Sequence, residues 1–459
     1  MVTRRRIIQA AALLPLASCA VTGGLEAPFL TAAPLAGHMT PTSVRLWLQS
    51  SIPARATIRF WPESGAPSNG RDLHIDLPLD ADNSGILEVN GLTANTRYRY
   101  QIALNGTPGG NGLFRTAPVA ALPFRLYLGS CAYTETLLPN GYPYGDGFDI
   151  FDNMAAKMAA DNLPHFMLWL GDNLYLRPKG IFLATSDVAS GAQISARYRS
   201  VRAMPMFQKL FAATHHYAIW DDHDFGPNDA DKSFRLKSDA LQVFKRYWPN
   251  PDMGSNDLPG TWTSFVHQDA EFFFLDDRTY RDAEAAPASE TKSMFGRAQL
   301  TWLKNSLAAS TATFKIICNG SQLWSENDNG VTSGWHSYAT ERNQFLAWLS
   351  EQKLAGLLFL SGDRHNTQVF RLKHPNAPVA YEFSCSPFTS RLSQISKRER
   401  ANPRFVEALA VEQRNFGTLE FVGSGATRKI VAASFDTSGR QLWRRVLASA
   451  TVDRDFEPV

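Results

Sequence analysis

The fold class of this chain is decided by residues 165–175, which read HFMLWLGDNLY. The run from Phe166 to Leu170 is wholly apolar, which is typical of a strand buried on both faces. It stops at Gly171, and Asp172 and Tyr175 follow within four residues. A buried strand that ends at a small residue and then delivers polar side chains predicts a layered α/β domain. In such domains the site lies beyond the carboxyl ends of the strands.

The same design occurs at three other places in the chain. Residues 124–129 (FRLYLG) precede Ser130 and Cys131, residues 217–220 (YAIW) precede residues 221–224 (DDHD), and residues 355–362 (AGLLFLSG) precede Asp363, Arg364 and His365. Helical stretches are expected near residues 148–160 and 299–308. One Asp after a strand is usually a turn residue or a helix cap. Four strand ends that deliver Cys, Asp, Tyr and His side chains predict one shared polar site.

The chain before residue 119 has a different character. Strand-period alternation marks residues 44–48, 56–60 and 98–102, with Gly, Pro and Asn clusters between them. Residues 89–100 (VNGLTANTRYRY) resemble the E–F corner of a fibronectin type III domain. A length of 459 residues also favours two domains. We expect a β-sandwich over residues 25–118, without catalytic residues, and the α/β domain over residues 119–459.

The first 24 residues predict an export signal. Arg4, Arg5 and Arg6 precede an apolar stretch that ends in Leu-Ala-Ser-Cys19. The paired arginines resemble a twin-arginine signal and the final four residues a lipoprotein box. An amphipathic starter helix is the weaker alternative, because polar and apolar residues do not alternate here. The protein is therefore expected either in the periplasm or anchored to the membrane by a lipid attached to Cys19.

Composition excludes some function classes and leaves the thiols open. A balance of 46 basic and 43 acidic residues gives a net charge of +3, without the clustered basic excess of a nucleic-acid-binding protein. If Cys19 is lipidated, three cysteines remain, so at least one thiol has a role other than a disulfide. Whether Cys318 and Cys385 pair stays open, and the sequence predicts no oligomeric state.

The residue types at the four strand ends suggest bound metal ions. A thiolate (Cys131), a phenolate (Tyr175), carboxylates and an imidazole (His365) together suit a trivalent or borderline transition ion. A set of carboxylates and amides suits a hard cation such as Ca²⁺. Taken singly, Cys131 could be a small buried apolar residue and Tyr175 a core aromatic.

Read in order, the four strand ends resemble the calcineurin-like metallophosphoesterases, and within them the alkaline phosphatase D (PhoD-like) family. The matching motifs are residues 129–131 (GSC), 171–175 (GDNLY), 220–224 (WDDHD) and 362–365 (GDRH), with further landmarks at 275–281 (LDDRTYR) and 335–342 (WHSYATER). The resemblance covers the chain from about residue 25 onward. It implies a four-layer α/β/β/α sandwich preceded by a fibronectin III-like β-sandwich.

The resemblance also implies a ligand set. Fe³⁺ would be held by Cys131, Asp172, Tyr175 and His365. Asp172 would bridge to Ca²⁺, which would also be held by Asp222, Asn228 and Asp363. The sequence departs from the family at Asp224, where the family has Glu, and residues 225–229 (FGPND) follow it. Asn319 stands where the wider superfamily has a histidine ligand, and it is either a ligand or a structural amide.

The expected activity is hydrolysis of phosphate monoesters, diesters or both. A hydroxide activated by metal ions would attack phosphorus, and His223 would protonate the leaving group or stabilise the transition state. Arg364 would contact the phosphate or, alternatively, form a salt bridge. Asp277 and Arg278 are expected to form a structural ion pair, and His215 and His216 are not expected at the site.

Two other functions compete with this one. A purple acid phosphatase also carries Gly-Asp-x-x-Tyr and an N-terminal β-domain, but this chain lacks that family's Asp-x-Gly, Gly-Asn-His and Gly-His-x-His motifs. A surface lipoprotein with a degenerate enzyme domain would bind ligands through its sandwich. The substrate is not fixed, since Tyr133, Tyr142 and Tyr144 could stack on an organic group or only order their loop.

Overall fold

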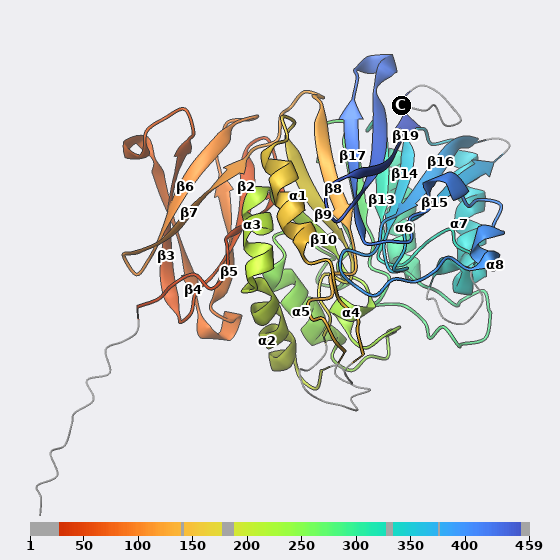
Figure 1. The fold of residues 1–459 in the computed structure, drawn as a ribbon, viewed down its shortest axis with the longest axis horizontal. Helices are drawn as coiled ribbons and strands as arrows, with labels where there is room; N and C mark the ends of the chain where they lie inside the picture. Colours follow the sequence, from red (N-terminus) through yellow and green to blue (C-terminus); the bar gives the residue numbers. More distant parts are fainter. Residues whose placement is uncertain (1–26, 139–141, 177–187, 327–333, 375–376, 451–459) are drawn as a thin grey trace, which may run out of the picture.

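The computed structural model describes residues 27–138, 142–176, 188–326, 334–374 and 377–450. A β-sandwich packs beside a larger α/β part that contains most of the helices (Figure 1). The predicted signal segment and Cys19 lie outside the described residues. Within the described ranges, no helix is long and apolar enough to cross a membrane.

The sandwich consists of two antiparallel sheets. Their strand orders are β1-β2-β5 and β4-β3-β6-β7. The strands are β1 (Leu35–Met39), β2 (Ser43–Gln49), β3 (Ala54–Pro62), β4 (Arg71–Leu77), β5 (Ser84–Asn90), β6 (Arg97–Leu104) and β7 (Thr107–Arg115). In β6, buried and exposed side chains alternate, as expected for a sheet with one solvated face. The Thr93 amide donates to the Tyr98 hydroxyl at 2.9 Å, a contact typical of the predicted fibronectin-like corner.

The α/β part contains two six-stranded sheets, ordered β10-β9-β8-β17-β18-β19 and β11-β12-β13-β14-β16-β15. Strands β8, β9 and β10 are parallel to one another, as are β12, β13, β14 and β16. The first sheet comprises β8 (Phe124–Gly129), β9 (His165–Leu170), β10 (His215–Ile219), β17 (Asn415–Val422), β18 (Lys429–Asp436) and β19 (Gln441–Ser449). The second comprises β11 (Thr263–His267), β12 (Ala270–Phe274), β13 (Phe314–Cys318), β14 (Leu357–Ser361), β15 (Gln368–His374) and β16 (Ala377–Ser384).

Helices cover the outer faces of both sheets. The α-helices are α1 (Asp149–Ala159), α2 (Gly191–Arg202), α3 (Pro205–Ala213), α4 (Asp222–Phe225), α5 (Lys237–Tyr247), α6 (Arg297–Ala309), α7 (Ala339–Gln352) and α8 (Lys397–Arg400). In β9, Met167 and Trp169 pack with α1, α2, α3 and α5, whereas Phe166 and Leu168 pack toward the second sheet. On the other side, Phe359 of β14 packs with α6 and α7. The predicted four-layer α/β/β/α architecture is confirmed.

The sandwich is joined to the α/β part through β1 and β10. The Gly37 carbonyl accepts a hydrogen bond from His215 Nδ1 at 2.7 Å, and the Arg115 amide donates to His215 Nε2 at 2.9 Å. The Met39 amide donates to the Tyr217 hydroxyl at 3.0 Å. The predicted boundary at residue 118 falls between β7 and β8, and the domain limits themselves stay predictions.

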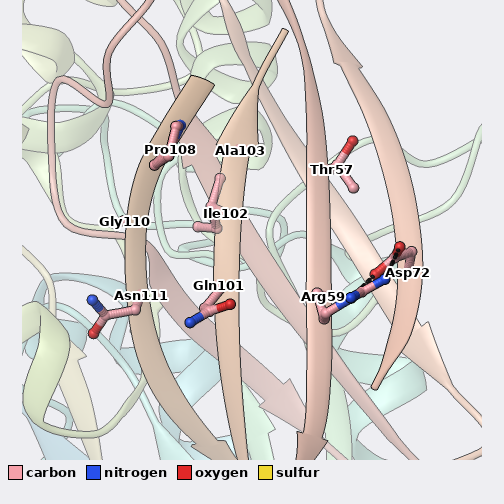
Figure 2. A pocket seen from close by; sticks show the side chains of 9 residues that line it. All are labelled: Thr57, Arg59, Asp72, Gln101, Ile102, Ala103, Pro108, Gly110 and Asn111. Atoms are coloured by element: carbon pink, nitrogen blue, oxygen red, sulfur yellow. Dashed lines mark hydrogen bonds and ion pairs between the residues drawn. The ribbon is translucent and has the colours of Figure 1, made fainter. Parts of the chain in front are cut away.

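A pocket lies on the outer face of the sandwich, over β3, β4, β6 and β7 (Figure 2). Its polar lining includes Arg59 and Asp72, which pair at 2.7 Å across β3 and β4. None of the residues that line this pocket is a predicted site residue. The chemistry indicated by the sequence is therefore sought at the strand ends of the α/β part.

Candidate metal centre

The four predicted strand ends meet where the two sheets of the α/β part adjoin. Cys131 and Asp172 follow β8 and β9 of the first sheet, and His365 follows β14 of the second. One ligand atom from each of these three residues lies within 4.8 Å of the others. The thiol and the imidazole, 234 positions apart in the sequence, are thus brought to the same place.

The backbone at these positions is unusual. Four predicted ligands have φ in the left-handed region: Cys131 (59°), Asp172 (50°), Asp363 (72°) and His365 (56°). Such conformations cost roughly 1–3 kcal/mol each for residues with a side chain, and they gather at functional sites. Here each one turns the chain sharply after a buried strand and directs a polar side chain back to the sheet edge.

The first ligand group has the spacing of a coordination sphere. Cys131 Sγ lies 3.5 Å from Asp172 Oδ2. The Tyr175 hydroxyl oxygen lies 3.2 Å from the same Asp172 oxygen and 3.3 Å from His365 Nε2. Two atoms that bind one transition ion at roughly 2.0–2.3 Å lie about 3–3.5 Å apart. Cys131 and Tyr175 are fully buried and Asp172 nearly so. A sulfur, a phenol oxygen, a carboxylate and an imidazole therefore fit a borderline or trivalent metal ion.

The second group shares Asp172 with the first. Ligand atoms of Asp172, Asp222 and His223 lie within 4.8 Å of one another. Asp222 is held in place because its two oxygens accept hydrogen bonds from the amides of His223 (2.9 Å) and Asp229 (2.7 Å). Asp172 thus belongs to both groups, and the bridging role that the resemblance implies for it stays a prediction.

Asp363 and Asn228 stand apart from these two groups. Asp363 is half-buried and belongs to neither group among the described residues. Asn228 is exposed, and its amide donates to Asp229 Oδ2 at 2.5 Å. The Asp229 carboxylate, which the sequence gave no reason to single out, acts electrostatically on both Asp222 and Asp363. It adds negative charge near the side predicted for calcium.

The electrostatics of the cluster call for positive charge. Burial and the neighbouring carboxylates, Asp222 first among them, raise the pKa of Asp172 well above its usual range. Burial likewise raises the pKa of the Cys131 thiol and of the Tyr175 phenol. For Asp363, burial raises the pKa to about 7 against the opposing effect of Arg364. Clustered acidic groups whose pKa values are raised by burial and by neighbouring negative charge are typical of sites that bind cations.

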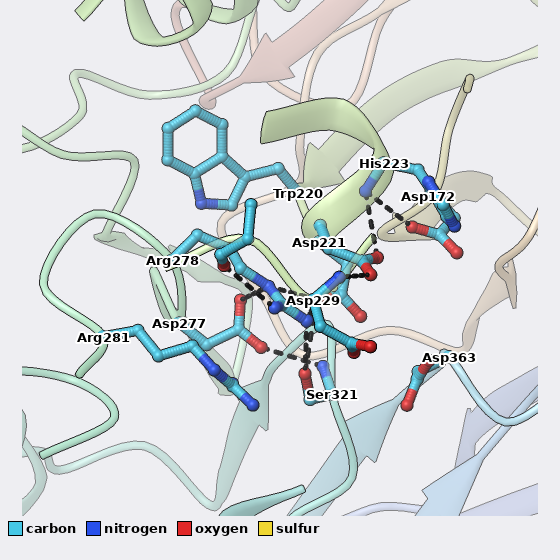
Figure 3. A network of polar contacts seen from close by, with 12 residues as sticks. Asp172, Trp220, Asp221, His223, Asp229, Asp277, Arg278, Arg281, Ser321 and Asp363 are labelled. Atoms are coloured by element: carbon cyan, nitrogen blue, oxygen red, sulfur yellow. Dashed lines mark hydrogen bonds and ion pairs between the residues drawn. The ribbon is translucent and has the colours of Figure 1, made fainter. Parts of the chain in front are cut away.

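An ionic network supports the second group from below (Figure 3). The buried guanidinium of Arg278 donates through Nε to Asp221 Oδ1 at 2.7 Å and through Nη2 to Ser321 Oγ at 2.9 Å. Asp277, the predicted ion-pair partner, lies 3.8 Å from Arg278 Nε. The pair is present, but Asp221 is the closer partner, and Asp221 caps the helix that carries Asp222 and His223.

Asn319 joins this network through its amide nitrogen. It donates to Asp277 Oδ2 at 3.1 Å and to the Ser321 carbonyl at 2.6 Å. Both contacts fix the amide nitrogen and leave the carbonyl oxygen, the atom through which an amide would bind a metal ion, uninvolved. The Asn319 carbonyl oxygen is buried and has no hydrogen-bond partner among the described residues.

Asp224, which replaces the family's Glu, connects the two ligand loops. Its carboxylate accepts hydrogen bonds from the amides of Asn173 (3.1 Å) and Asp221 (3.1 Å). Burial raises the pKa of Asp224 to about 8 against these hydrogen bonds. The Asp224 side chain thus links the loop that carries Asp172 to the segment that carries Asp222.

The two predicted catalytic residues differ in their surroundings. His223 is buried, and its ring stacks on Tyr175 with 4.1 Å between centroids. Arg364 Nη2 lies 2.6 Å from Glu399 Oε1, so the structure contains the salt bridge that the sequence left as the alternative. Its Nε is buried without a hydrogen-bond partner among the described residues.

Other open questions from the sequence concern the thiols and the tyrosines. Cys318 and Cys385 are both buried free thiols in the described chain. Tyr133 and Tyr144 lie against the site: the Tyr133 ring is 4.9 Å from the Tyr175 ring, and the Tyr144 ring is 6.0 Å from the His365 ring. Tyr142 is 68% exposed. His215 and His216 bond to backbone groups away from the site.

Comparisons with known proteins relate the chain to phosphatases. A model of the PhoD-like phosphatase family matches residues 130–431. Alkaline phosphatase D of Bacillus subtilis (strain 168) is 23% identical over 351 residues, which cover 68% of this chain and 56% of that protein. The match thus spans little more than half of that relative's length.

Two solved structures resemble the fold. The structure of PhoD superposes with a TM-score of 0.72 at 18% identity and covers 94% of both chains. Purple acid phosphatase PPD1 from yellow lupin (Lupinus luteus) seeds superposes with a TM-score of 0.63 at 11% identity, covering 91% of this chain and 74% of that one. At these identities the likeness concerns the fold alone.

Proposed function

The chain belongs to the PhoD-like phosphatase family, and from this premise we propose that it is a metal-dependent hydrolase of phosphate esters. The observation that carries the proposal is the meeting of Cys131, Asp172, Tyr175 and His365, whose donor atoms lie at coordination spacing. Membership confirms the predicted resemblance. The activity, and the choice between monoesters and diesters, belong to the proposal.

We propose Fe³⁺ for the first ligand group and Ca²⁺ for the second. Two anionic donors of different softness, Cys131 and Tyr175, favour a trivalent ion in the first group. Apart from His223, the second group offers only oxygen atoms, and oxygen ligands suit a hard cation. The proposed ligands of this cation are Asp172, Asp222, Asp363 and Asn228. Bound metal ions would supply positive charge to the phosphate oxygens and lower the pKa of water at the site.

The chain's own contribution is to orient the substrate and move a proton. His223 is fixed at both ends, because its amide donates to Asp222 and its ring stacks on Tyr175. The imidazole is therefore pre-oriented, and its near-neutral intrinsic pKa suits transfer of a proton to the leaving alkoxide or a hydrogen bond to a phosphate oxygen. Arg364 adjoins Asp363, and the proposal assigns it a phosphate contact in addition to its pair with Glu399.

The test is an assay of purified protein on a panel of aryl and alkyl monoesters and diesters, with and without chelator, together with metal analysis by plasma emission. We expect hydrolysis that chelator abolishes and that returns when iron and calcium are restored. Protein that carries its full metal complement and hydrolyses no phosphoester would overturn the proposal.

The same panel separates the competing functions. Highest activity at acidic pH would favour a purple-acid-phosphatase-like enzyme. A degenerate surface lipoprotein would carry no metal and have no activity. The buried acidic side chains of Cys131, Asp172 and Asp222 argue against degeneracy, because buried carboxylates and thiols without a function are costly to keep.

We also propose export, either to the periplasm or as a lipoprotein anchored through Cys19. This proposal rests on Arg4, Arg5 and Arg6 and on the Leu-Ala-Ser-Cys19 box. Fractionation of cells that express the full chain, with palmitate labelling, tests it. Cys19→Ala should abolish the label, and Arg4→Lys with Arg5→Lys should keep the protein in the cytoplasm.

A further inference from the structure

A segment that the sequence motifs did not indicate lies directly against the first ligand group. It follows β16 and runs from Ser386 to Ser390. Both serines are fully buried. Each presents its hydroxyl to a different anionic ligand: Ser386 to the Cys131 sulfur and Ser390 to the Tyr175 oxygen.

The hydrogen bonds of Ser386 settle the direction of its proton. Its oxygen accepts the His365 amide at 3.0 Å, and Cys131 Sγ lies 3.1 Å away. A hydroxyl has one proton to donate. A thiolate has no proton to donate, so toward Cys131 the Ser386 hydroxyl is the donor, while a lone pair on its oxygen accepts the His365 amide. Ser386 thereby connects a ligand of β8 to a ligand of β14.

Ser130 provides the contrast. Its Oγ is 3.5 Å from the same sulfur, but it donates to the Cys385 carbonyl at 2.9 Å. Its proton is therefore committed elsewhere. Of the two serine hydroxyls near the thiol, only that of Ser386 has its proton available to the sulfur.

Ser390 has a similar relation to Tyr175. The two oxygens are 2.8 Å apart, and the Ser390 hydroxyl also lies 3.0 Å from the Cys131 carbonyl. That carbonyl already accepts the amides of Thr389 and Ser390. When Tyr175 is a phenolate, the Ser390 proton can turn to it without leaving the carbonyl unbonded.

We propose that Ser386 and Ser390 are positioning residues that hydrogen-bond the thiolate of Cys131 and the phenolate of Tyr175 and so set the electronic properties of the metal they hold. The inference rests on the proposed iron site. Hydrogen bonds to ligand atoms orient them and tune the bound metal. A donor directed at a thiolate or phenolate withdraws electron density and stabilises the filled ligand orbital, which raises the energy of ligand-to-iron charge transfer.

The experiment compares the optical spectra of the metal-loaded full chain and three variants, Ser386→Ala, Ser390→Ala and Ser130→Ala. Removal of the Ser386 or Ser390 hydroxyl should shift the charge-transfer absorption to longer wavelength and make the iron easier to lose in a chelator competition. Ser130→Ala is the matched control: it deletes a hydroxyl beside the same sulfur and should leave the band in place. Circular dichroism checks that each variant is folded.

The outcomes separate this inference from the proposed function. A coloured native protein whose band is unchanged in folded Ser386→Ala and Ser390→Ala overturns the inference alone. An equal shift in Ser130→Ala also overturns it, since the effect would then come from packing. A colourless native protein without iron overturns the proposed iron site and this inference with it. Ser390→Thr, which keeps a hydroxyl, should retain the native band.

Discussion

The ring of Tyr175 stacks on the imidazole of His223, with 4.1 Å between centroids and 30° between the planes. One ring belongs to a proposed metal ligand and the other to the proposed proton donor. The contact with His223 is made by the ring of Tyr175, whereas the proposed metal ligation is made by its hydroxyl oxygen. Variants that keep the ring but lose the hydroxyl can therefore separate them.

Tyr175→Phe should abolish any phenolate-to-iron absorption while the stack with His223 remains. Tyr175→Leu should remove both the phenolate-to-iron absorption and the stack with His223. We expect both variants to lose the phenolate part of the visible absorption and Tyr175→Phe to keep more of any residual activity, because its imidazole remains oriented. Optical spectroscopy with iron analysis and initial rates measures the difference. If Tyr175→Phe keeps the native visible band, Tyr175 is not the chromophoric ligand.

His223→Ala should lower kcat by about 10²–10⁴-fold, the usual contribution of a general acid, with iron and calcium content near that of the native protein. An acid role also predicts a larger loss on alkyl esters than on aryl esters, since an aryl oxide leaves without help. His74, exposed on β4, supplies the control: His74→Ala should have native kinetics. An equal fractional loss of kcat on alkyl and aryl esters in His223→Ala would rule out the acid role.

The pair formed by Arg364 and Glu399 can be broken at either residue, and the two single variants have different expected effects. Glu399 caps α8 and also accepts from Gln368 Nε2 at 3.0 Å, so it stays partly bonded without Arg364. Breaking a buried pair by removing one partner costs about 3–5 kcal/mol, and we expect the lower end for Arg364→Met. The phosphate contact predicts in addition weaker inhibition by inorganic phosphate in Arg364→Met but not in Glu399→Gln. If both variants bind phosphate normally, the arginine is structural only.

The four strand ends could be predicted because a short, continuous stretch of sequence determines each of them. A wholly apolar run such as Phe166 to Leu170 has to be buried, and the polar residues behind it have to emerge at the sheet edge. The sequence also predicts that the sandwich is separate from the α/β part. Apolar and polar residues alternate along the strands of the sandwich, whereas the predicted strands of the α/β part are mostly continuous apolar runs. The family motifs supplied the ligand set that these local patterns could not.

What escaped prediction depends on contacts between distant segments. The closest partner of Arg278 is Asp221, fifty-seven positions away, rather than its neighbour Asp277. Ser386 and Ser390 follow a strand without any acidic or imidazole residue beside them, so no pattern distinguishes them from other buried serines. Their role follows only from the packing of β16 beside β14, which brings this segment to Cys131.

A cluster of buried histidines at the junction of the sandwich and the α/β part leads to a prediction on pH. Burial lowers the pKa of His38 and of His215 to about 4 and that of His267 to about 3. The groups that act on them are one another, His165, Arg45, Arg115 and Asp252. In His215, both ring nitrogens bond to backbone groups, which requires the neutral ring.

The sign of the effect follows from linkage. Because the folded state disfavours protonated histidine, the unfolded chain binds more protons below its pKa near 6.5, and the free energy of unfolding must fall as pH drops from about 6.5 toward 4. For His215 alone the loss between pH 8 and pH 5 is about 2 kcal/mol. His215→Gln should be less stable at pH 8, yet its stability should fall by about 2 kcal/mol less over this interval. Urea unfolding at a series of pH values measures this slope, with exposed His74→Gln as the control. Parallel curves for His215→Gln and the native protein would show that His215 does not carry the acid sensitivity.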